Sequence, residues 1–409
     1  MFAGSASFYY GLGSFFKPVV DEFGWSYAQT AFVLSIYQVE GGLMAPLVGF
    51  LFDRFGPRRL IMLGGFLLGV GFMLMSRVDS FTIFFASVLV MSVGFSTGFA
   101  GIGMATLANW FARRLTLAMG VCFIGGGAGG VLVPALVWSI GQWGWRPTAL
   151  ATGFLVWLVV IPLAQLVSHR PEQRGLRMDG ASPGPAPSHL SKAGKASPPL
   201  VEVGVGVREA LRTRSFWMLT LISGLSFAAN SALVVHQIPF LVSIGMTPQQ
   251  GGFVLALMTL VSLPGRVGFG WLADRWSRRH TLALVFVLQG LGVLAFAFAN
   301  NPLALITYLV IYGPAMGGGV PLRPSLQAEL FGRRSFGSIQ GIIQGLAGTA
   351  GIAGPVYAGW MYDVGGGYQT AFVLLAVTII VGIIPTMLVA PVSQQTPAAA
   401  VPETVANRA

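Results

Sequence analysis

Twelve runs of about 20 mostly apolar residues follow one another along this chain, and they constrain its fold more than any other feature. A helix of about that length crosses a hydrocarbon layer of about 30 Å. Alternation of the strand type is absent, so the runs are helices and not barrel strands. The sequence predicts an all-α membrane protein with twelve spans, at about 1–20, 26–52, 60–77, 80–109, 115–141, 147–168, 215–243, 248–272, 280–299, 302–330, 336–362 and 367–392.

Charge supports the same class. Only 9% of residues are charged and the net charge is +11, but the basic residues are scattered through short loops, which argues against nucleic acid as a partner. With both termini cytoplasmic, 19 of the 24 Lys and Arg fall in cytoplasmic segments, as the positive-inside rule requires. We expect a multi-pass protein of the cell inner (plasma) membrane, in contact with the lipid bilayer.

The chain also divides into two similar parts. Residues 169–214 are rich in Pro, Gly, Ser and basic residues and read as a cytoplasmic linker. "DRFGPRR" from Asp53 returns as "DRWSRR" from Asp274, an offset of about 220 that other segments share. We therefore expect an N-terminal six-helix half (1–168), the linker, a C-terminal six-helix half (215–392) and a cytoplasmic tail (393–409), with a central site between the halves.

These features together resemble the major facilitator superfamily of transporters. The family's loop motif stands at Gly49, Asp53, Arg54, Gly56, Arg58 and Arg59, with a degenerate copy at Gly270, Asp274, Arg275, Arg278 and Arg279. The resemblance implies twelve transmembrane helices in two six-helix halves around a central cavity, working by alternating access. We expect a monomer.

Some of the loop charges are candidates for a latch between the halves. Asp53 can face the positive N-terminal ends of helices, or Arg113 and Arg114 in the next loop. Glu329, with Arg333 four residues on, is the expected counterpart in the second half. Plain topology-setting charge is the alternative. The gating candidates are Asp53, Arg54, Arg113, Asp274, Arg275, Glu329 and Arg333.

The first outer loop, "FFKPVVDEFGWS", resembles the monocarboxylate transporters and the oxalate:formate antiporters. That resemblance implies that Arg266, eight residues before Asp274, binds the substrate carboxylate. Two departures from the pattern of these relatives narrow the range of substrates that the resemblance implies. Ser262 stands where related monocarboxylate transporters carry an acid, and the eleventh span lacks the lysine of oxalate carriers, which disfavours oxalate.

Two arginines inside apolar spans carry the substrate hypothesis. Arg266 and Arg323 each lie about eight residues before the loop charges, so we expect them at a similar depth, where they could converge. An intramembrane arginine costs roughly 2.5 to 3.5 kcal/mol on insertion scales and therefore usually faces a wet cavity or a partner. Its planar fork matches a carboxylate. A buried structural pair is the alternative for each.

Four further side chains are candidates in the spans. Glu40 could carry a proton or pair with an arginine, and His236 could join the proton path. Tyr9 and Tyr10 could offer hydroxyls and an aromatic wall to a small acid. Structural hydrogen bonding is the alternative for Glu40 and His236, and aromatic packing for the tyrosines.

The sequence thus predicts a secondary transporter of a small organic anion, a monocarboxylate in the first instance, coupled to protons. Efflux of lipophilic compounds and dicarboxylate exchange remain open. Four histidines and one cysteine show no metal-ligand or nucleophile spacing, so we expect neither an enzyme, nor a metal site, nor a cofactor.

Overall fold

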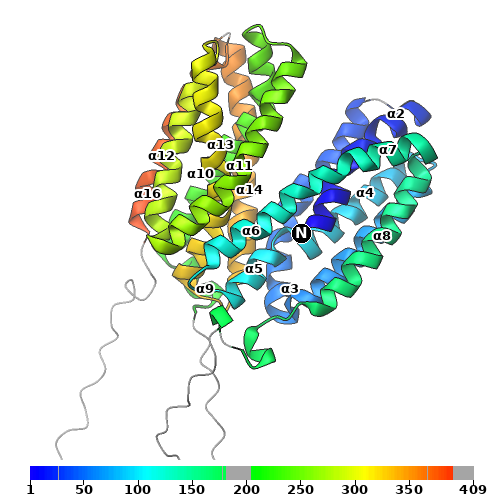
Figure 1. The fold of residues 1–409 in the computed structure, drawn as a ribbon, viewed down its shortest axis with the longest axis horizontal. Coiled ribbons are helices and arrows are strands. Elements are labelled where there is room, and N and C mark those ends of the chain that lie inside the picture. The colour runs from blue at the N-terminus through cyan, green and yellow to red at the C-terminus, as the bar shows by residue number, and fades with distance from the viewer. Residues whose placement is uncertain (26, 177, 181–203, 366, 390–409) are drawn as a thin grey trace, which may run out of the picture.

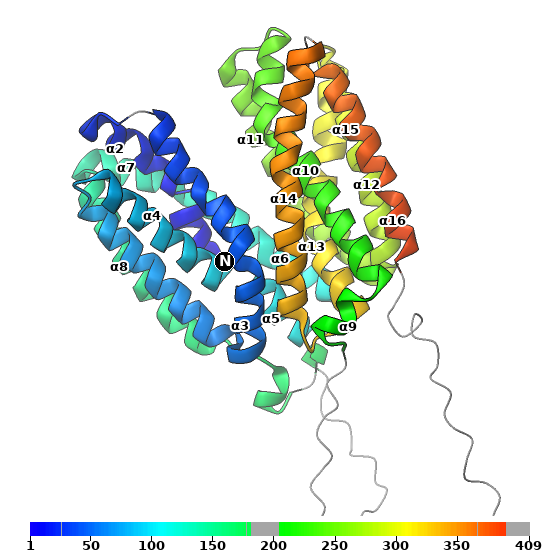
Figure 2. The ribbon, with the colours of Figure 1, turned by 180° about the vertical axis from the view of Figure 1, so that it is seen from behind.

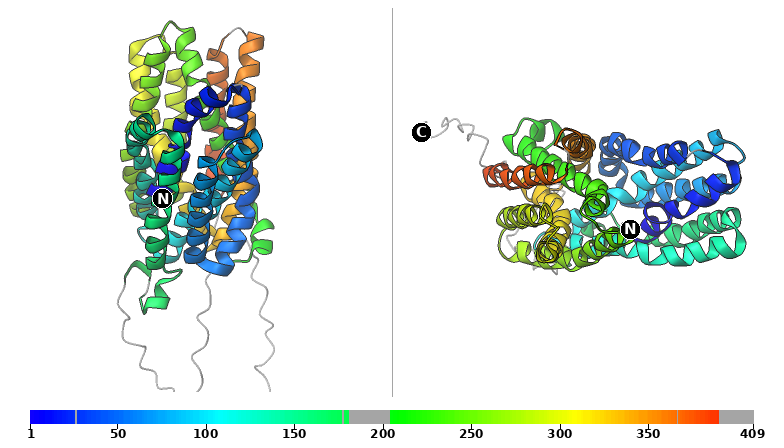
Figure 3. Two further views of the ribbon diagram at one scale, coloured as in Figure 1. Left: turned by 90° about the vertical axis from the view of Figure 1, so that its right-hand side faces the viewer. Right: turned by 90° about the horizontal axis from the view of Figure 1, so that it is seen from above.

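The computed structural model describes residues 1–25, 27–176, 178–180, 204–365 and 367–389, and helices make up most of these residues. The helices form two bundles that lie side by side, one from each half of the sequence (Figure 1 and Figure 3). Among the described residues, β-pairing is limited to an isolated bridge between Gly204 and Gly332. The predicted all-α fold is confirmed.

The first bundle contains long helices interrupted by short turns of π- or 3-10 helix, which carry η labels. Its elements are α1 (Phe2–Gly4), η1 (Ser5–Tyr9), η2 (Leu12–Phe15), α2 (Phe16–Phe23), α3 (Tyr27–Ser76), α4 (Phe81–Phe95), η3 (Ser96–Ala100), α5 (Ile102–Trp110), α6 (Leu115–Ala128), η4 (Gly129–Leu132), α7 (Val133–Trp143) and α8 (Trp145–Leu166).

The second bundle follows three short linker elements and has longer uninterrupted helices. These elements are η5 (Pro171–Arg174), η6 (Met178–Gly180) and α9 (Val207–Leu211) in the linker, and then α10 (Arg214–Ser243), α11 (Pro248–Arg275), α12 (Arg278–Phe296), α13 (Pro302–Phe331), α14 (Phe336–Gly365), α15 (Gln369–Val381) and α16 (Ile383–Leu388).

Nine helical stretches of the described residues are long and apolar enough to cross a membrane. The difference from twelve has three local causes. α3 joins the second and third predicted spans across a kink at Gly56, whose φ of 76° suits a residue without a side chain. The Gly- and Gln-containing α14 is not among the nine. The first predicted span is not one helix.

The expectation of a continuous helix over 1–20 is therefore wrong. The chain there passes from α1 through the π-turn η1 and the 3-10 turn η2 to α2. Glycine is a weak helix former, and a side chain on Gly11 would stand 2.4 Å from the backbone oxygen of Ala6. Turns interrupt the predicted spans 80–109 and 115–141 in the same way, at η3 and η4. Residues 390–392 of the last predicted span and the predicted tail lie outside the described residues.

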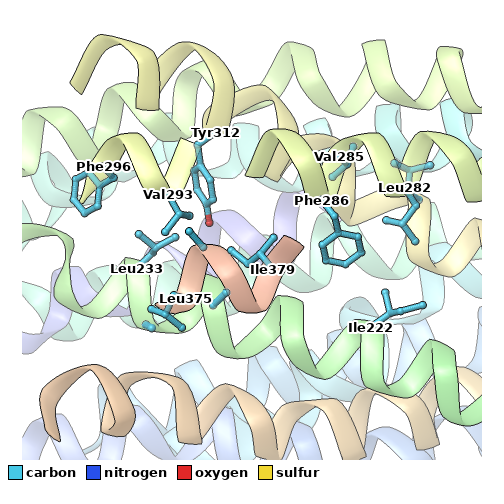
Figure 4. Packing of buried hydrophobic residues seen from close by; sticks show 14 of the residues in the cluster. Ile222, Leu233, Leu282, Val285, Phe286, Val293, Phe296, Tyr312, Leu375 and Ile379 are labelled. Carbon is cyan, nitrogen blue, oxygen red and sulfur yellow. The ribbon is translucent and has the colours of Figure 1, made fainter. Parts of the chain in front are cut away.

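Each bundle has its own apolar core. In the second bundle the core includes Phe286, Phe296 and Ile379, with Tyr312 projecting among them from α13 (Figure 4). The buried hydroxyl of Tyr308 donates to Oε1 of Gln237 at 3.1 Å, and that of Tyr312 to Oδ1 of Asn230 at 3.4 Å. These bonds satisfy phenols that would otherwise be costly to bury.

The bundles meet at the end of the molecule where η5, η6 and α9 lie, here called the linker side, and they diverge at the opposite end (Figure 1 and Figure 2). α3 packs against α14 there, and α6 against α11. The first contact is made by glycines: a Cβ on Gly49 would stand 2.0 Å from the carbonyl oxygen of Gly337, and one on Gly341 2.1 Å from that of Ala45. Small residues thus let the two backbones touch.

We predict that Gly49→Ala destabilises this arrangement because its methyl group would overlap the backbone of α14. Overpacking of this kind typically costs about 1 to 3 kcal/mol. The measurement is the thermal unfolding midpoint of the purified protein. Gly42→Ala is the matched control on the same helix, because a Cβ there meets nothing within 4 Å. Equal midpoints for the two variants would contradict the prediction.

Candidate functional site

Asp53, at the linker-side bend of α3, binds the first residues of α14. Its carboxylate accepts hydrogen bonds from the backbone N–H of Gly337 (3.0 Å), from that of Ser338 (2.8 Å) and from the Ser338 hydroxyl (2.6 Å). These N–H groups belong to the first turn of a helix, where no intrahelical acceptor exists. A carboxylate at this position also faces the positive end of the helix dipole. Asp53 of the first bundle therefore caps a helix of the second.

Asp274 makes the reciprocal contact from the last turn of α11. It accepts hydrogen bonds from the backbone N–H groups of Thr116 (3.1 Å) and Leu117 (2.9 Å), in the first turn of α6. Asp274 lies 221 positions after Asp53, and Gly337 and Ser338 lie 221 positions after Thr116 and Leu117. The internal repeat thus becomes a pair of equivalent caps. The expectation that Asp53 faces a helix N-terminus agrees with this geometry.

Ion pairs surround the two caps. Glu329 and Arg333, expected together as the counterpart of Asp53 in the second half, each pair with a residue of another element. Glu329 pairs with Arg278 (3.2 Å), which also donates to the carbonyl of Ala112 (2.6 Å). Arg333 pairs with Glu172 of the linker (2.7 Å). The helical spacing of Glu329 and Arg333 permitted a pair, but nearer charges from other elements replace it.

Glu172 links the linker to the second bundle electrostatically. Burial alone would raise its pKa, but the hydrogen bond and the charge of Arg333 hold the pKa below its usual value. A lowered carboxyl pKa means that the contact contributes stability above the ordinary pKa, and that this stability is lost as pH falls through the lowered value.

The remaining gating candidates lie at the edge of this contact. The Arg54 side chain is exposed, with its guanidinium 5.4 Å from the ring of Phe55, and Arg275 lies 4.4 Å from the ring of Trp271 on its own helix. Arg113 is exposed, and its backbone N–H donates to Asp179 at 3.1 Å. The sequence left two kinds of partner open for Asp53, and the structure has it bind helix N–H groups and not Arg113.

Arg266 bridges the two bundles inside the apolar part of the molecule. Its Nη1 donates to the backbone carbonyl of Phe123 on α6 at 2.5 Å, while its Nε is buried without a hydrogen-bond partner among the described residues. A Cβ on Gly127 would stand 3.3 Å from Nη1. The glycine-rich end of α6 is therefore what admits the guanidinium.

Tyr9 and Tyr10 lie within electrostatic range of Arg266. Their rings meet edge to face with centroids 4.9 Å apart, and Tyr9 is 53% exposed. The Tyr10 ring approaches Gly130, three residues beyond the glycine that faces Arg266. The structure thus brings the two tyrosines near Arg266.

Arg323 does not share these contacts. Its Nε donates to the carbonyl of Gly319 one turn back (3.2 Å), and its guanidinium lies 5.3 Å from the ring of Phe227 on α10. Nη1 is buried without a partner among the described residues. Spacing along the helices suggested that Arg266 and Arg323 could converge, but the helices turn them in different directions, one toward the first bundle and one into the second.

Glu40 is buried in the first bundle. Its Oε2 accepts hydrogen bonds from the hydroxyls of Ser92 and Ser96, the latter at 2.9 Å, and its Oε1 has no partner among the described residues. Because Ser92 and Ser96 are four residues apart, they face the same side of the chain. This spacing was the signal that could have identified them as the partners of Glu40.

His236 has two partners within the second bundle. Nε2 lies 2.9 Å from the backbone oxygen of Pro355, and Nδ1 lies 3.3 Å from the hydroxyl of Tyr368. Since the carbonyl can only accept, Nε2 carries a hydrogen and donates it to Pro355. This is the hydrogen-bonding role that the sequence analysis left open beside the proton path.

A cavity of about 310 Å³ lies between the bundles. Neither arginine lines it. Glu40 lies beside two of its lining residues, Gly41 and Ser96, and Arg323 lies behind a third, Phe227. The cavity is lined by Gly41, Gly42, Ala45, Val48, Gly49, Phe52, Phe95, Ser96, Gly101, Ile102, Met104, Ala105, Phe227, Gly337, Gln340, Gly341, Gln344 and Gly348.

Sequence reasoning missed several residues of this region. Phe227 and Asn230 gave no signal, because an aromatic or an amide in an apolar helix is common in packed cores. Glu172 and Asp179 stand in a linker whose sequence has no periodicity, so their contacts depend on how the linker folds back.

The sequence profile of the Major Facilitator Superfamily matches the chain at residues 1–244 and again at 237–408. Among curated proteins, Monocarboxylate transporter 12 of Rattus norvegicus is 27% identical over 382 aligned residues, covering 88% of this chain and 77% of that protein. Monocarboxylate transporter 13 of Bos taurus is 27% identical over 374 residues, covering 90% and 82%.

Solved transporter structures share the fold. The E. coli fucose:proton symporter FucP superimposes with a TM-score of 0.71 at 15% identity, covering 95% of this chain and 96% of that chain. The human organic anion transporter MFSD10 gives a TM-score of 0.64 at 17% identity, covering 92% and 89%.

We predict that Asp53→Asn weakens the linker-side contact, because the amide lacks the charge that faces the α14 dipole. Loss of a cap costs about 0.5 to 2 kcal/mol, which shifts an equilibrium roughly 2- to 30-fold toward separation. Double electron–electron resonance between spin labels at Arg54→Cys and Arg334→Cys, in a Cys122→Ala background, should show a larger population at long distance. Asp79→Asn, exposed in the loop between α3 and α4, is the control. An unchanged distance distribution in Asp53→Asn would refute the role of the cap.

Proposed function

Because the chain belongs to the major facilitator superfamily, we propose that this multi-pass transporter carries a small organic anion, a monocarboxylate in the first instance, by alternating access coupled to protons. Its curated relatives are named monocarboxylate transporters. In this proposal the linker side is cytoplasmic, both termini lie there, and the protein works as a monomer in the plasma membrane.

The observation that carries the proposal is the incompletely bonded guanidinium of Arg266. A charged donor without a partner in an apolar region is expensive, by about 1 to 3 kcal/mol or more. Its only hydrogen bond among the described residues is to the Phe123 carbonyl, which leaves Nε unpaired. A carboxylate that approaches the Nε edge side-on supplies two acceptors and a compensating charge.

Tyr9 and Tyr10 complete this site in the proposal. Tyr9 is exposed and its ring meets that of Tyr10 edge to face, and Tyr10 packs on the glycine-rich end of α6. Phenol hydroxyls can donate to a substrate oxygen. The arrangement suits a short hydroxy or keto acid.

Glu40 is the proposed proton-linked group. Two serine hydroxyls hold one of its oxygens, and the other has no partner among the described residues. No basic side chain among the described contacts neutralises the carboxylate. Its position beside the cavity-lining residues Gly41 and Ser96 gives a proton a route.

Alternating access then depends on the caps. The bundles are joined at the linker side by Asp53 and Asp274 and diverge at the other end, which corresponds to an outward-facing state. Opening inward requires both carboxylates to leave their helix N-termini, so we propose Asp53, Asp274 and the surrounding ion pairs as the gate.

A second candidate is transport of lipophilic compounds. The apolar lining of the 310 Å³ cavity favours it, because drug-sized ligands occupy apolar pockets of about this size with few polar groups. The two candidates are separated by measuring the uptake of labelled lactate into proteoliposomes with pyruvate or with tetraphenylphosphonium as the competitor. Only the lipophilic route is blocked by the cation.

Arg266→Lys should bind lactate roughly ten- to a hundredfold more weakly than the wild type. An ammonium keeps the charge but loses the planar fork, and one charge-assisted bond is worth about 1.5 to 3 kcal/mol. Calorimetric titration of the folded variant measures this. An affinity equal to that of the wild type would remove Arg266 from the substrate site.

Glu40→Gln should lose the acceleration of lactate uptake by an inward proton gradient but keep lactate-for-lactate exchange, since exchange needs no net deprotonation. Uptake and exchange in proteoliposomes with an imposed pH difference give both numbers. Gradient-driven accumulation that persists in the variant would exclude Glu40 as the coupling group.

A further inference from the structure

A small chamber of about 50 Å³ lies inside the second bundle, beside Arg323. A space that holds one water needs only about 10 to 15 Å³ by a comparable measure, so the chamber has room for a small polar group. Residues of four helices, α10, α12, α13 and α15, surround it. Its lining residues are Ser226, Phe227, Ala229, Asn230, Gln289, Tyr312, Met316, Val320, Arg323 and Ile379.

The chamber is rich in hydrogen-bond donors and its lining contains no acid. Nη1 of Arg323 is buried and has no hydrogen-bond partner among the described residues. Oδ1 of Asn230 accepts from Tyr312, so the Asn230 amide N–H groups remain available to donate. Tyr312 projects from α13 toward Ile379 (Figure 4), and both residues line the chamber. This composition suits a negatively charged acceptor.

Phe227 separates the chamber from the large cavity. It lines both spaces, and its ring lies 5.3 Å from the Arg323 guanidinium, within the range of a cation–π contact. A charge-assisted hydrogen bond to a carboxylate is typically stronger than such a contact. An anion can therefore displace the ring, and a rotation of this one side chain would join the two spaces.

The large cavity indicates what kind of anion enters. Most of its lining is glycine, alanine, branched or aromatic side chain and methionine, and its polar side chains are Ser96, Gln340 and Gln344. A short hydroxy acid would leave most of this surface unfilled. A phenyl ring or a branched carbon chain would bury apolar area there, which favours binding.

We propose that Arg323 and Asn230 bind the carboxylate of an organic anion whose aromatic or branched body fills the large cavity, after the Phe227 ring turns aside. The proposal rests on the proposed transport of organic anions. It adds an anchor separate from Arg266 and a preference for bulky acids over short ones.

The test is calorimetric titration of the full chain in lipid nanodiscs with phenylacetate and with lactate. The wild type should bind phenylacetate at least tenfold more tightly than lactate. Arg323→Gln should weaken phenylacetate binding ten- to a hundredfold and lactate binding by much less, whereas Arg266→Lys should show the reverse order. Asn230→Ala should lose about tenfold for phenylacetate, and it serves as the readout if Arg323→Gln does not fold.

Phe227→Leu tests whether the Phe227 ring controls entry to the chamber, because a smaller side chain leaves the chamber open. The association rate of phenylacetate, measured by stopped flow, should rise severalfold. Phe253→Leu is the matched control, since Phe253 is exposed on α11 and lines neither the large cavity nor the chamber.

The outcomes distinguish this inference from the proposed function. Lactate binding that is sensitive to Arg266→Lys, together with wild-type phenylacetate affinity in folded Arg323→Gln or Asn230→Ala, would overturn the chamber and leave the transport proposal standing. A wild type that binds neither acid would overturn both.

Discussion

Two carboxylates, each at the end of one bundle and bound to the first turn of a helix in the other, hold the linker side together. Asp53 and Asp274 use N–H groups that a helix cannot satisfy by itself. The contact is therefore strong while it is made and leaves helix N-termini open to water when broken. Glycines at the α3/α14 contact supply the close approach that it needs. A latch of this kind suits a molecule that must have two stable arrangements.

The charged side chains inside the apolar region differ from the capping aspartates, because each of them is incompletely hydrogen-bonded. Arg266, Arg323 and Glu40 all have one buried polar atom without a partner among the described residues. A structural ion pair would have joined an acid to a base and removed this cost. Instead, serine hydroxyls bind Glu40, and backbone carbonyls accept hydrogen bonds from the two arginines. An aromatic ring also lies beside Arg323. Separate, unsatisfied charges around a cavity are what a ligand or a proton can use.

Much of the fold was predictable from the sequence. Apolar length and loop charge report on how each segment interacts with a bilayer, and this interaction depends little on neighbouring helices. The 220-residue repeat is visible when the two halves of the sequence are compared. The same reasoning failed for residues 1–20, where glycines and tight packing divide an apolar run into short turns. Of the candidate site, the capping aspartates were accessible, because the repeated loop motif marks Asp53 and Asp274.

The sequence by itself determined which residues are charged within apolar helices and, through the helical rise, roughly how deep they lie. Only the tertiary structure decided where they point. Arg266 and Arg323 stand at similar distances from their loops, but the rotation of α11 and α13 directs one across to α6 and the other behind Phe227. Helix rotation is set by packing against several neighbours at once. That information is spread over residues far apart in the chain, so no local pattern contains it.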